Sequence, residues 1–550
     1  MAPGYREVSS ARMSRLGKVA GWSPLAGLAA AVAAAIPMLA WAVALAARRP
    51  TLYFDGDAAL DEISLVNSTH LAQLVGNYSR FGWWHPGPAW FYTMDILYVP
   101  LGRESWAFSV AVAVFQAVLA LLILYICWRI AGLPLVAVGS ALLLGYYALV
   151  GDALFRSIWP PYLVILPMLL LILLAALGIS GSTPALAAAL VVGSFEIQTH
   201  VGTAPATVAV VGGAFVLRVV LDRLAARRTG WGPRPDGRWK WPLSAAGAVL
   251  TVVMWIPPLV DEVTGNPGNL TALFRFFTHN GPSRGYRAAL SALGRFVDPL
   301  EFPKLTGFGG LDLSATSNLQ IAVAITFAVL CAGLAFMGWR ARDRFALGLG
   351  VVLVLAMGAV TLSIRDIAGP VYFYLLMWVT TLPVALLLGA LTFGLAHPPQ
   401  AHLRVPRTAR LVTGAAGAAL LVILAVAQTA SFLTLQPDEP LTQHLDQLTA
   451  GTESALAAHP SDPVVVEPSG LQVWPTAAGI GLQLLKDGHP IRVAPNWVFM
   501  FGKQSRLQGD EQWAVVVVLA ADAPSYERSN PDATLAGTNG VYSVFLRKIR

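Results

Sequence analysis

Long apolar runs separated by short polar segments dominate the first 435 residues of the chain. About eleven runs reach 18 or more residues, which is enough to cross a hydrocarbon core about 30 Å thick. The predicted spans are 24–47, 106–128, 134–152, 160–179, 183–200, 203–221, 241–260, 317–338, 345–363, 371–395 and 409–433. A lipid-exposed backbone must satisfy its own hydrogen bonds, so each run is expected to be helical. The pattern predicts a polytopic α-helical membrane protein.

Composition supports this class. Of the 550 residues, 56% are hydrophobic and 12% are charged, whereas a soluble domain carries about 25% charged residues. An ordinary soluble enzyme is therefore excluded. The net charge of +7 does not indicate a nucleic-acid partner, because Lys and Arg lie mostly in short loops between the spans, where they set orientation.

Loop charge predicts the orientation. If the N-terminus is cytoplasmic, the basic loops are also cytoplasmic, as the positive-inside rule requires. These loops carry Arg129, Arg223, Arg227, Arg228, Arg234, Arg238, Lys240, Arg340, Arg342, Arg344, Arg404, Arg407 and Arg410. The first run follows Arg6, Arg12, Arg15 and Lys18 and is too long for a signal peptide, so we interpret it as a retained signal anchor. We expect a multi-pass plasma-membrane protein whose C-terminal domain is extracytoplasmic.

The chain divides into a predicted transmembrane domain, residues 1–435, and a soluble domain, residues 436–550. Two long outer loops are expected, at 48–105 and 261–314, and the second contains an amphipathic stretch that is expected to lie along the membrane surface. Strand-like runs occur at 463–468, 490–495, 513–520 and 541–549, with a helix-like segment at 476–488 between the first two. This order predicts a small α/β domain with a partly parallel sheet.

Four acids crowd into eight positions of the first outer loop: Asp55, Asp57, Asp61 and Glu62. One interpretation is a solvated loop in which an Asp caps a short helix. The other is a functional cluster, because an aromatic and basic segment follows.

That segment, "RFGWWHPGPAWFY", contains Arg80, Trp83, Trp84 and His85. Aromatic residues at a membrane interface commonly form an anchoring belt, but the same rings suit sugar faces and prenyl chains. Arg80 is a candidate phosphate ligand, because guanidinium matches phosphate oxygens bidentately. His85 is either a helix-entry residue before proline or an orienting group.

An acidic cluster in the first outer loop, followed about 28 residues later by His85-Pro86, resembles the GT-C superfamily of polyprenyl-phosphate-sugar-dependent glycosyltransferases, especially its protein mannosyltransferase and aminoarabinose transferase branches. The resemblance implies a GT-C-like fold and inverting transfer of a sugar from a polyprenyl-phosphate donor to an outer glycan, lipid or protein acceptor. The sequence departs from the usual pattern in two places. Asp55-Gly56-Asp57 replaces an Asp-Glu pair, and His85-Pro86-Gly87 replaces His-Pro-Pro.

Sugar transfer passes through an oxocarbenium-like state, and the acceptor hydroxyl must lose a proton to a base. Asp55 is our first candidate for that base, because it lies closest to the membrane exit, and Asp57 is the second. Asp61 and Glu62 are expected to bind substrate. The spacing of Asp55 and Asp57 could also hold a divalent cation, Mg²⁺ or Mn²⁺, although many relatives are metal-independent.

Three further residues are candidate substrate ligands. Glu196 and His200 lie four residues apart at the predicted outer end of a span. Ionisable groups within spans mark functional sites by default, although capping or snorkelling is the alternative. Arg156, in a short outer loop, is a second candidate phosphate ligand.

Two other classes remain open: a transporter or lipid flippase, and a non-catalytic scaffold of the cell envelope. Transporters place polar groups on paired broken helices near mid-bilayer, whereas the polar residues here cluster at one membrane face. The sequence also contains no phosphate-binding loop and no dinucleotide fingerprint. A membrane glycosyltransferase is therefore the favoured prediction.

Overall fold

The computed structural model describes residues 32–227, 231, 241–279, 284–305, 310–311, 316–398, 407–434 and 439–549. Residues 24–31 of the first predicted span, the basic residues before it, and Arg228, Arg234, Arg238, Lys240 and Arg404 lie outside this part. The chain forms two compact units, which are described separately. Unit 1 comprises Met1–Trp41, Ala113–Ile256 and Phe276–Thr434, and unit 2 comprises Ala42–Val112, Pro257–Arg275 and Leu435–Arg550.

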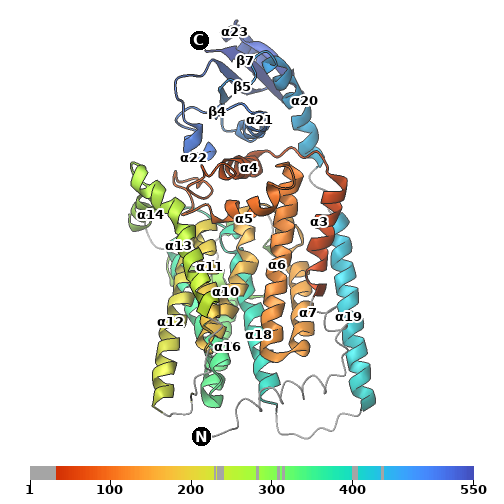
Figure 1. The fold of residues 1–550 in the computed structure, drawn as a ribbon, viewed down its shortest axis with the longest axis vertical. Coiled ribbons are helices and arrows are strands. Elements are labelled where there is room, and N and C mark those ends of the chain that lie inside the picture. The colour runs from red at the N-terminus through yellow and green to blue at the C-terminus, as the bar shows by residue number, and fades with distance from the viewer. Residues whose placement is uncertain are drawn as a thin grey trace. The chain divides into compact units, whose positions relative to one another are not determined.

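Unit 1 consists mainly of long helices that run side by side (Figure 1). These are α7 (Leu133–Val150), α10 (Ile165–Ile179), α11 (Thr183–Thr199), α12 (Ala204–Ala226), α16 (Asn318–Ala341), α17 (Arg344–Arg365), α18 (Thr381–Ala396) and α19 (Arg407–Thr434), with most of α6 (Ser105–Ala131) and α13 (Trp241–Thr264). Glycine allows α16 and α17 to approach closely, because a Cβ on Gly350 would lie 2.6 Å from the Cys331 carbonyl oxygen. Small residues at such interfaces are typical of membrane helix packing.

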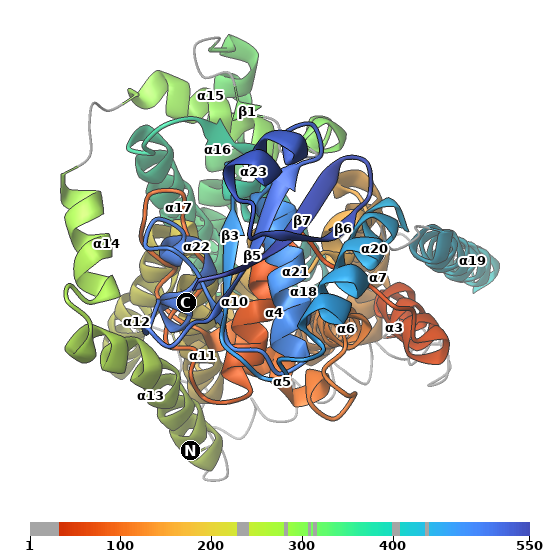
Figure 2. The ribbon, with the colours of Figure 1, turned by 90° about the horizontal axis from the view of Figure 1, so that it is seen from above.

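Short elements join these helices. They are α8 (Ala153–Arg156), α9 (Pro160–Leu163), η1 (Val201–Thr203), α15 (Tyr286–Val297), η3 (Phe302–Lys304), η4 (Phe373–Leu375), η5 (Met377–Thr380), and the antiparallel pair β1 (Gly310–Leu311) and β2 (Val371–Tyr372). In Figure 2, α15 lies beside α16, against which it packs. The amphipathic stretch predicted in the second outer loop thus forms α15 and α14 (Asn269–Thr278).

Nine helices among the described residues are long and apolar enough to cross a membrane. They are Ser105–Ala131, Leu133–Val150, Pro160–Ile179, Val201–Ala226, Trp241–Thr264, Asn318–Ala341, Arg344–Arg365, Met377–Ala396 and Ala415–Thr434. The other two predicted spans correspond to shorter helices, α3 (Ile36–Arg48) with 13 residues and α11 with 17. The chain is a multi-pass membrane protein, but the predicted count of eleven spans is not confirmed.

Unit 2 contains a five-stranded sheet in the order β4-β3-β5-β7-β6. Its strands are β3 (Val464–Pro468), β4 (Ile491–Arg492), β5 (Trp513–Leu519), β6 (Thr534–Thr538) and β7 (Tyr542–Lys548), and its helices include α20 (Glu439–Leu456), α21 (Trp474–Lys486), α22 (Val498–Phe501), η6 (Lys503–Ser505) and α23 (Ala523–Ser529). Strand β3 pairs in parallel with β4 and β5, whereas β7 pairs antiparallel with β5 and β6. The predicted partly parallel sheet is confirmed.

The first outer loop folds into the core of this same unit. It forms α4 (Gly56–Ser68) and α5 (Ala89–Tyr98). Ala59, Leu60 and Ile63 of α4 are buried in one hydrophobic cluster with residues of α21 and β3. In both views α4 and α21 lie side by side (Figures 1 and 2). The acids of α4 are therefore held on a rigid helix rather than in a solvated loop.

Candidate functional site

Helix α4 and its N-cap position carry all four predicted acids, with Asp61 and Glu62 in the middle of the helix. Asp55 occupies the N-cap position, but its side chain makes no capping hydrogen bond. Asp57 and Asp61 are four residues apart and therefore share one face of the helix. Glu62 does not contact the partners of this pair; it binds Lys486, Tyr98 and Ser105 instead.

The Asp57–Asp61 pair faces a short hairpin-like segment. The Tyr78 hydroxyl donates to Asp57 Oδ1 at 2.5 Å, and the Asn77 amide donates to Asp61 Oδ1. The Trp90 indole N–H donates to Asn77 Oδ1 at 3.0 Å, which fixes the amide. Because Asn77 and Tyr78 are neighbours in the chain, their hydrogen bonds hold both carboxyl groups against the same segment.

Burial determines the protonation of this pair. It raises the pKa of Asp57 above its ordinary value, while the hydrogen bond from Tyr78 opposes that rise. The pKa of Asp61 is raised well above its ordinary value, first by burial and then by the charge of Asp57. Asp61 is only 1% exposed, and its Oδ2 has no hydrogen-bond partner among the described residues. Asp61 therefore retains its proton to higher pH than an ordinary Asp.

Replacing Asp61 with Asn should make thermal stability less dependent on pH. An unfolded Asp titrates near pH 3.9, and the folded group retains its proton to higher pH. Stability should therefore fall as the pH rises from about 4 towards the raised pKa, and D61N should flatten that fall. Unfolding of the full-length protein in detergent, followed between pH 4 and 8, measures it. D532N, which changes an exposed carboxylate, should follow the wild type, and an equally steep D61N profile would contradict the assignment.

Glu62 belongs to a separate, completely buried network. Lys486 Nζ lies 2.6 Å from Glu62 Oε1, and the Tyr98 hydroxyl donates to the same oxygen at 2.9 Å. The Ser105 hydroxyl donates to Oε2 at 2.7 Å and accepts from Lys486 at 2.8 Å. Each oxygen of Glu62 thus has a partner, which indicates that this carboxylate ties α4 to α21.

The segment with Trp83, Trp84 and His85 is fixed by Asn269. The Asn269 amide donates to the Trp84 carbonyl at 2.9 Å and accepts from the Trp84 N–H at 3.0 Å. The Trp83 ring meets the His85 ring edge-on, with the centroids 5.7 Å apart. Lys503 Nζ lies 5.3 Å from the centre of the Trp84 ring. The segment is therefore held in place, with the Trp83 ring buried and the Trp84 and His85 side chains half-buried.

Arg80 lies on the exposed part of this segment, with its guanidinium 4.9 Å from the centre of the Phe81 ring. It is thus not buried against the Asp57–Asp61 pair. An exposed guanidinium over an aromatic ring remains accessible to an anionic ligand.

Unit 1 holds the other three candidates. The Arg156 guanidinium lies 4.7 Å from the centre of the Trp41 ring. Glu196 is completely buried in the last turns of α11, and His200 follows as its C-cap at 2% exposure. The adjacent Gln198 donates to the Met254 carbonyl at 3.0 Å. The structure therefore brings Glu196 and His200 together at one helix end, within unit 1.

The predicted divalent-cation site at Asp55 and Asp57 stays a prediction. Among the described residues, no group of three or more His, Cys, Asp and Glu side chains could hold a metal ion. One oxygen each of Asp57 and Asp61 already accepts a hydrogen bond. We derive no step through a metal.

Several residues of this arrangement were not among the sequence predictions. Asn77 and Tyr78 lie between the acids and the aromatic segment, and their polar side chains were the available signal. Lys486 and Asn269 are distant in the sequence, and nothing local marks them as partners of Glu62 and Trp84.

No protein-family model and no curated protein matches the sequence. The structure is similar to crystal structures of ArnT from Cupriavidus metallidurans. The one bound to undecaprenyl phosphate has a TM-score of 0.56 and 14% sequence identity, and the match covers 93% of this chain and 96% of that chain. The apo structure has a TM-score of 0.54 and 15% identity, with 92% and 96% covered.

This similarity concerns the fold and extends over nearly the whole of both chains. The predicted fold class, a polytopic α-helical membrane protein with a small C-terminal α/β domain, is confirmed, and the fold is that of ArnT.

Proposed function

We propose that this protein is a membrane glycosyltransferase that moves a sugar from a polyprenyl-phosphate donor to an acceptor on the outer side of the membrane. The ArnT structure with the same fold binds undecaprenyl phosphate, which supports a donor of this chemical class. The acceptor is a glycan, a lipid or a protein. The observation that carries the proposal is the first-loop carboxylate cluster on α4 within a fold matched over 93% of the chain.

Asp55 is the proposed general base. Asp55 stands at the N-cap position of α4, directly before the first turn of the helix. The positive end of the helix dipole favours its carboxylate form. Asp57 is the second candidate, although its Oδ1 is held by Tyr78.

The proposed reaction is a single inverting displacement. The acceptor oxygen forms a bond to the anomeric carbon as the bond to the phosphate oxygen breaks, and the hydroxyl proton passes to Asp55. The electron pair of the broken bond leaves on the polyprenyl phosphate, whose charge needs a cation. Arg80 and Arg156 are the proposed phosphate ligands, and Trp83, Trp84, His85, Glu196 and His200 are proposed to bind the substrates.

Donor binding tests the proposal with the full-length protein in nanodiscs. Undecaprenyl phosphate should bind at least about tenfold more tightly than undecaprenol, which has the same chain without the charge, because hydrogen bonds to charged groups contribute about 1.5–3 kcal/mol. Native mass spectrometry with both lipids in competition measures the ratio. Equal binding of the two lipids would contradict a phosphate-linked donor.

Product formation separates the remaining classes. Membranes that contain the protein should convert labelled polyprenyl-phosphate sugars into a new glycoside. A flippase would move the lipid across vesicles without forming a glycosidic bond, and a scaffold would do neither.

A further inference from the structure

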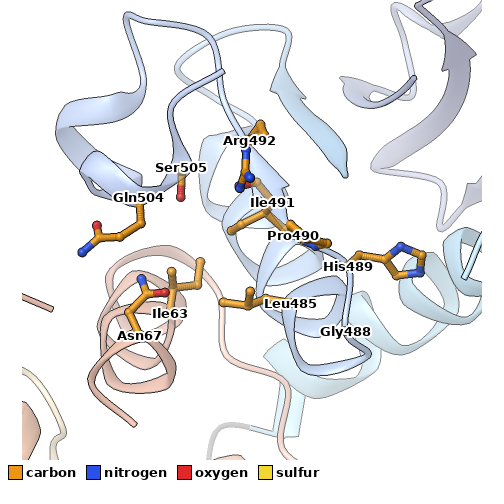
Figure 3. A pocket seen from close by; sticks show the side chains of 10 residues that line it. All are labelled: Ile63, Asn67, Leu485, Gly488, His489, Pro490, Ile491, Arg492, Gln504 and Ser505. Carbon is orange, nitrogen blue, oxygen red and sulfur yellow. The ribbon is translucent and has the colours of Figure 1, made fainter. Parts of the chain in front are cut away.

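A pocket of about 210 Å³ lies within unit 2, apart from the Asp57–Asp61 pair. It is lined by Ile63, Asn67, Leu485, Gly488, His489, Pro490, Ile491, Arg492, Gln504 and Ser505. Figure 3 shows these side chains around it, coming from α4, from the C-terminal end of α21, from β4 and from the segment near residue 505. Ile63 and Asn67 project from a different face of α4 than Asp57 and Asp61, as their helical spacing requires.

Arg492 is the charged group of the pocket. Its side chain is only 12% exposed, and its Nε has no hydrogen-bond partner among the described residues. Nη1 donates to the carbonyl of Ile491 at 3.1 Å. A buried guanidinium whose donors are not filled is costly, so an anion that reached it would relieve this cost.

Glu511 forms an ion pair with this guanidinium but no hydrogen bond to its Nε. Glu511 Oε1 lies 3.9 Å from Arg492 Nε, beyond hydrogen-bond distance. The Glu511 carboxylate instead accepts from the backbone N–H groups of Gln508 at 2.6 Å and Gly509 at 3.0 Å. Glu511 is therefore held by its own loop, and Arg492 retains donors for a ligand.

The other polar groups of the pocket suit hydroxyl groups. The side-chain amide of Asn67 makes no hydrogen bond within the described part of the chain. The Gln504 amide donates to the Ala72 carbonyl at 2.7 Å, which leaves its oxygen as an acceptor. Ser505 Oγ donates to the Phe501 carbonyl at 3.2 Å and can still accept. In Figure 3 the His489 ring points away from these groups.

Apolar side chains complete the lining: Ile63, Leu485, Pro490 and Ile491. The C–H face of a sugar ring packs on such surfaces while its hydroxyls meet amide groups. Pockets for drug-sized ligands measure about 300–1,000 Å³, so this smaller pocket fits a single ring rather than an oligosaccharide.

We propose that this pocket binds one sugar residue that carries a carboxylate or a phosphate, with the anion on Arg492 and the hydroxyls on Asn67 and Gln504. The pocket would recognise an anionic glycan unit at a site separate from the α4 carboxylates. This inference does not depend on the proposed transferase activity, because its test measures binding alone.

The test uses the full-length protein in detergent and three probes of similar size: glucuronate, glucose 6-phosphate and glucose. Isothermal titration calorimetry should detect glucuronate or glucose 6-phosphate, and glucose should bind at least about tenfold more weakly, because the bond to a charged group is lost. The two anionic probes distinguish a carboxylate from a phosphate. Inorganic phosphate tests whether the anion alone is sufficient, and binding as tight as that of glucose 6-phosphate would overturn the sugar part of the proposal.

R492Q should weaken binding of the anionic probe about 10- to 100-fold, as expected for loss of a charge-assisted contact. R528Q, which changes an exposed arginine of the same domain, is the matched control and should bind as the wild type does. N67A retains the Arg492–Glu511 pair and provides a second variant if R492Q does not fold; it should weaken binding severalfold. If no anionic probe binds, or if folded R492Q or N67A binds it as tightly as the wild type, the proposal is wrong.

Discussion

Replacing Asp55 with Asn is expected to lower the rate of sugar transfer about 100- to 10,000-fold, the usual contribution of a positioned general base. Asn retains the size of the side chain but cannot accept the proton of the acceptor hydroxyl. Because Asn is as favourable as Asp at the N-cap position of a helix, α4 should lose little stability. The initial rate of glycoside formation in nanodiscs at saturating donor measures the effect, and binding of undecaprenyl phosphate should be unchanged.

Two further variants test whether the loss of transfer is specific to Asp55. D532N changes an exposed carboxylate of the same unit and should transfer sugar at the wild-type rate. D57N should have a smaller effect than D55N, because Asp57 is partly occupied by Tyr78. If D57N abolishes transfer and D55N does not, Asp57 is the base. If both variants retain the wild-type rate, no first-loop Asp serves as the base.

The long apolar spans were predictable because each is determined by its own sequence. The shorter helices show the limit of this approach. α11 ends at Thr199, one residue before the predicted end of the span 183–200. Hydropathy places this boundary well, but the helix has only 17 residues and falls below the length of the nine candidate spans.

The sheet of the C-terminal domain shows the same contrast. Buried strands such as β5 read as continuous apolar runs, as expected for strands covered on both faces. β6 was not predicted, because its sequence, "TLAGT", is mostly polar or small and it lies at the sheet edge. β4 is only two residues long, although the segment 490–495 predicted a longer strand, because Val493 pairs with Arg506 instead of continuing along β3.

The candidate site was predictable only in its local part. The spacing of Asp57 and Asp61 places them on one helical face without further information. Their different environments depend on Tyr78 and Asn77, whose hydrogen bonds require the loop to fold back on α4. Glu62 forms an ion pair with Lys486, and these two residues come together only when the C-terminal domain folds. Non-local partners of this kind leave no pattern in one sequence.

Replacing Lys486 with Met should destabilise unit 2 by about 3–5 kcal/mol, the usual cost of removing one partner of a buried ion pair. Met retains much of the apolar stem of Lys, but Glu62, which is 0% exposed, would lose the Lys486 ammonium that lies 2.6 Å from Oε1. Tyr98 and Ser105 would still donate to it, yet neither neutralises the charge. Chemical unfolding of the full-length protein in detergent measures the loss, and K548M, which removes an exposed Lys from β7, should have little effect.

The double variant E62Q/K486M distinguishes charge compensation from packing. Removing the carboxylate charge together with its cation eliminates the unpaired ion, and a Gln amide can still donate to the Ser105 hydroxyl and accept from Tyr98. Most of the stability lost in K486M should therefore return, since a buried pair replaced as a whole costs far less than one that is broken. A double variant as unstable as K486M would instead mean that Lys486 holds α4 and α21 together through its methylene chain. In that case the carboxylate of Glu62 would not be the group that fixes the helix on which Asp55 is mounted.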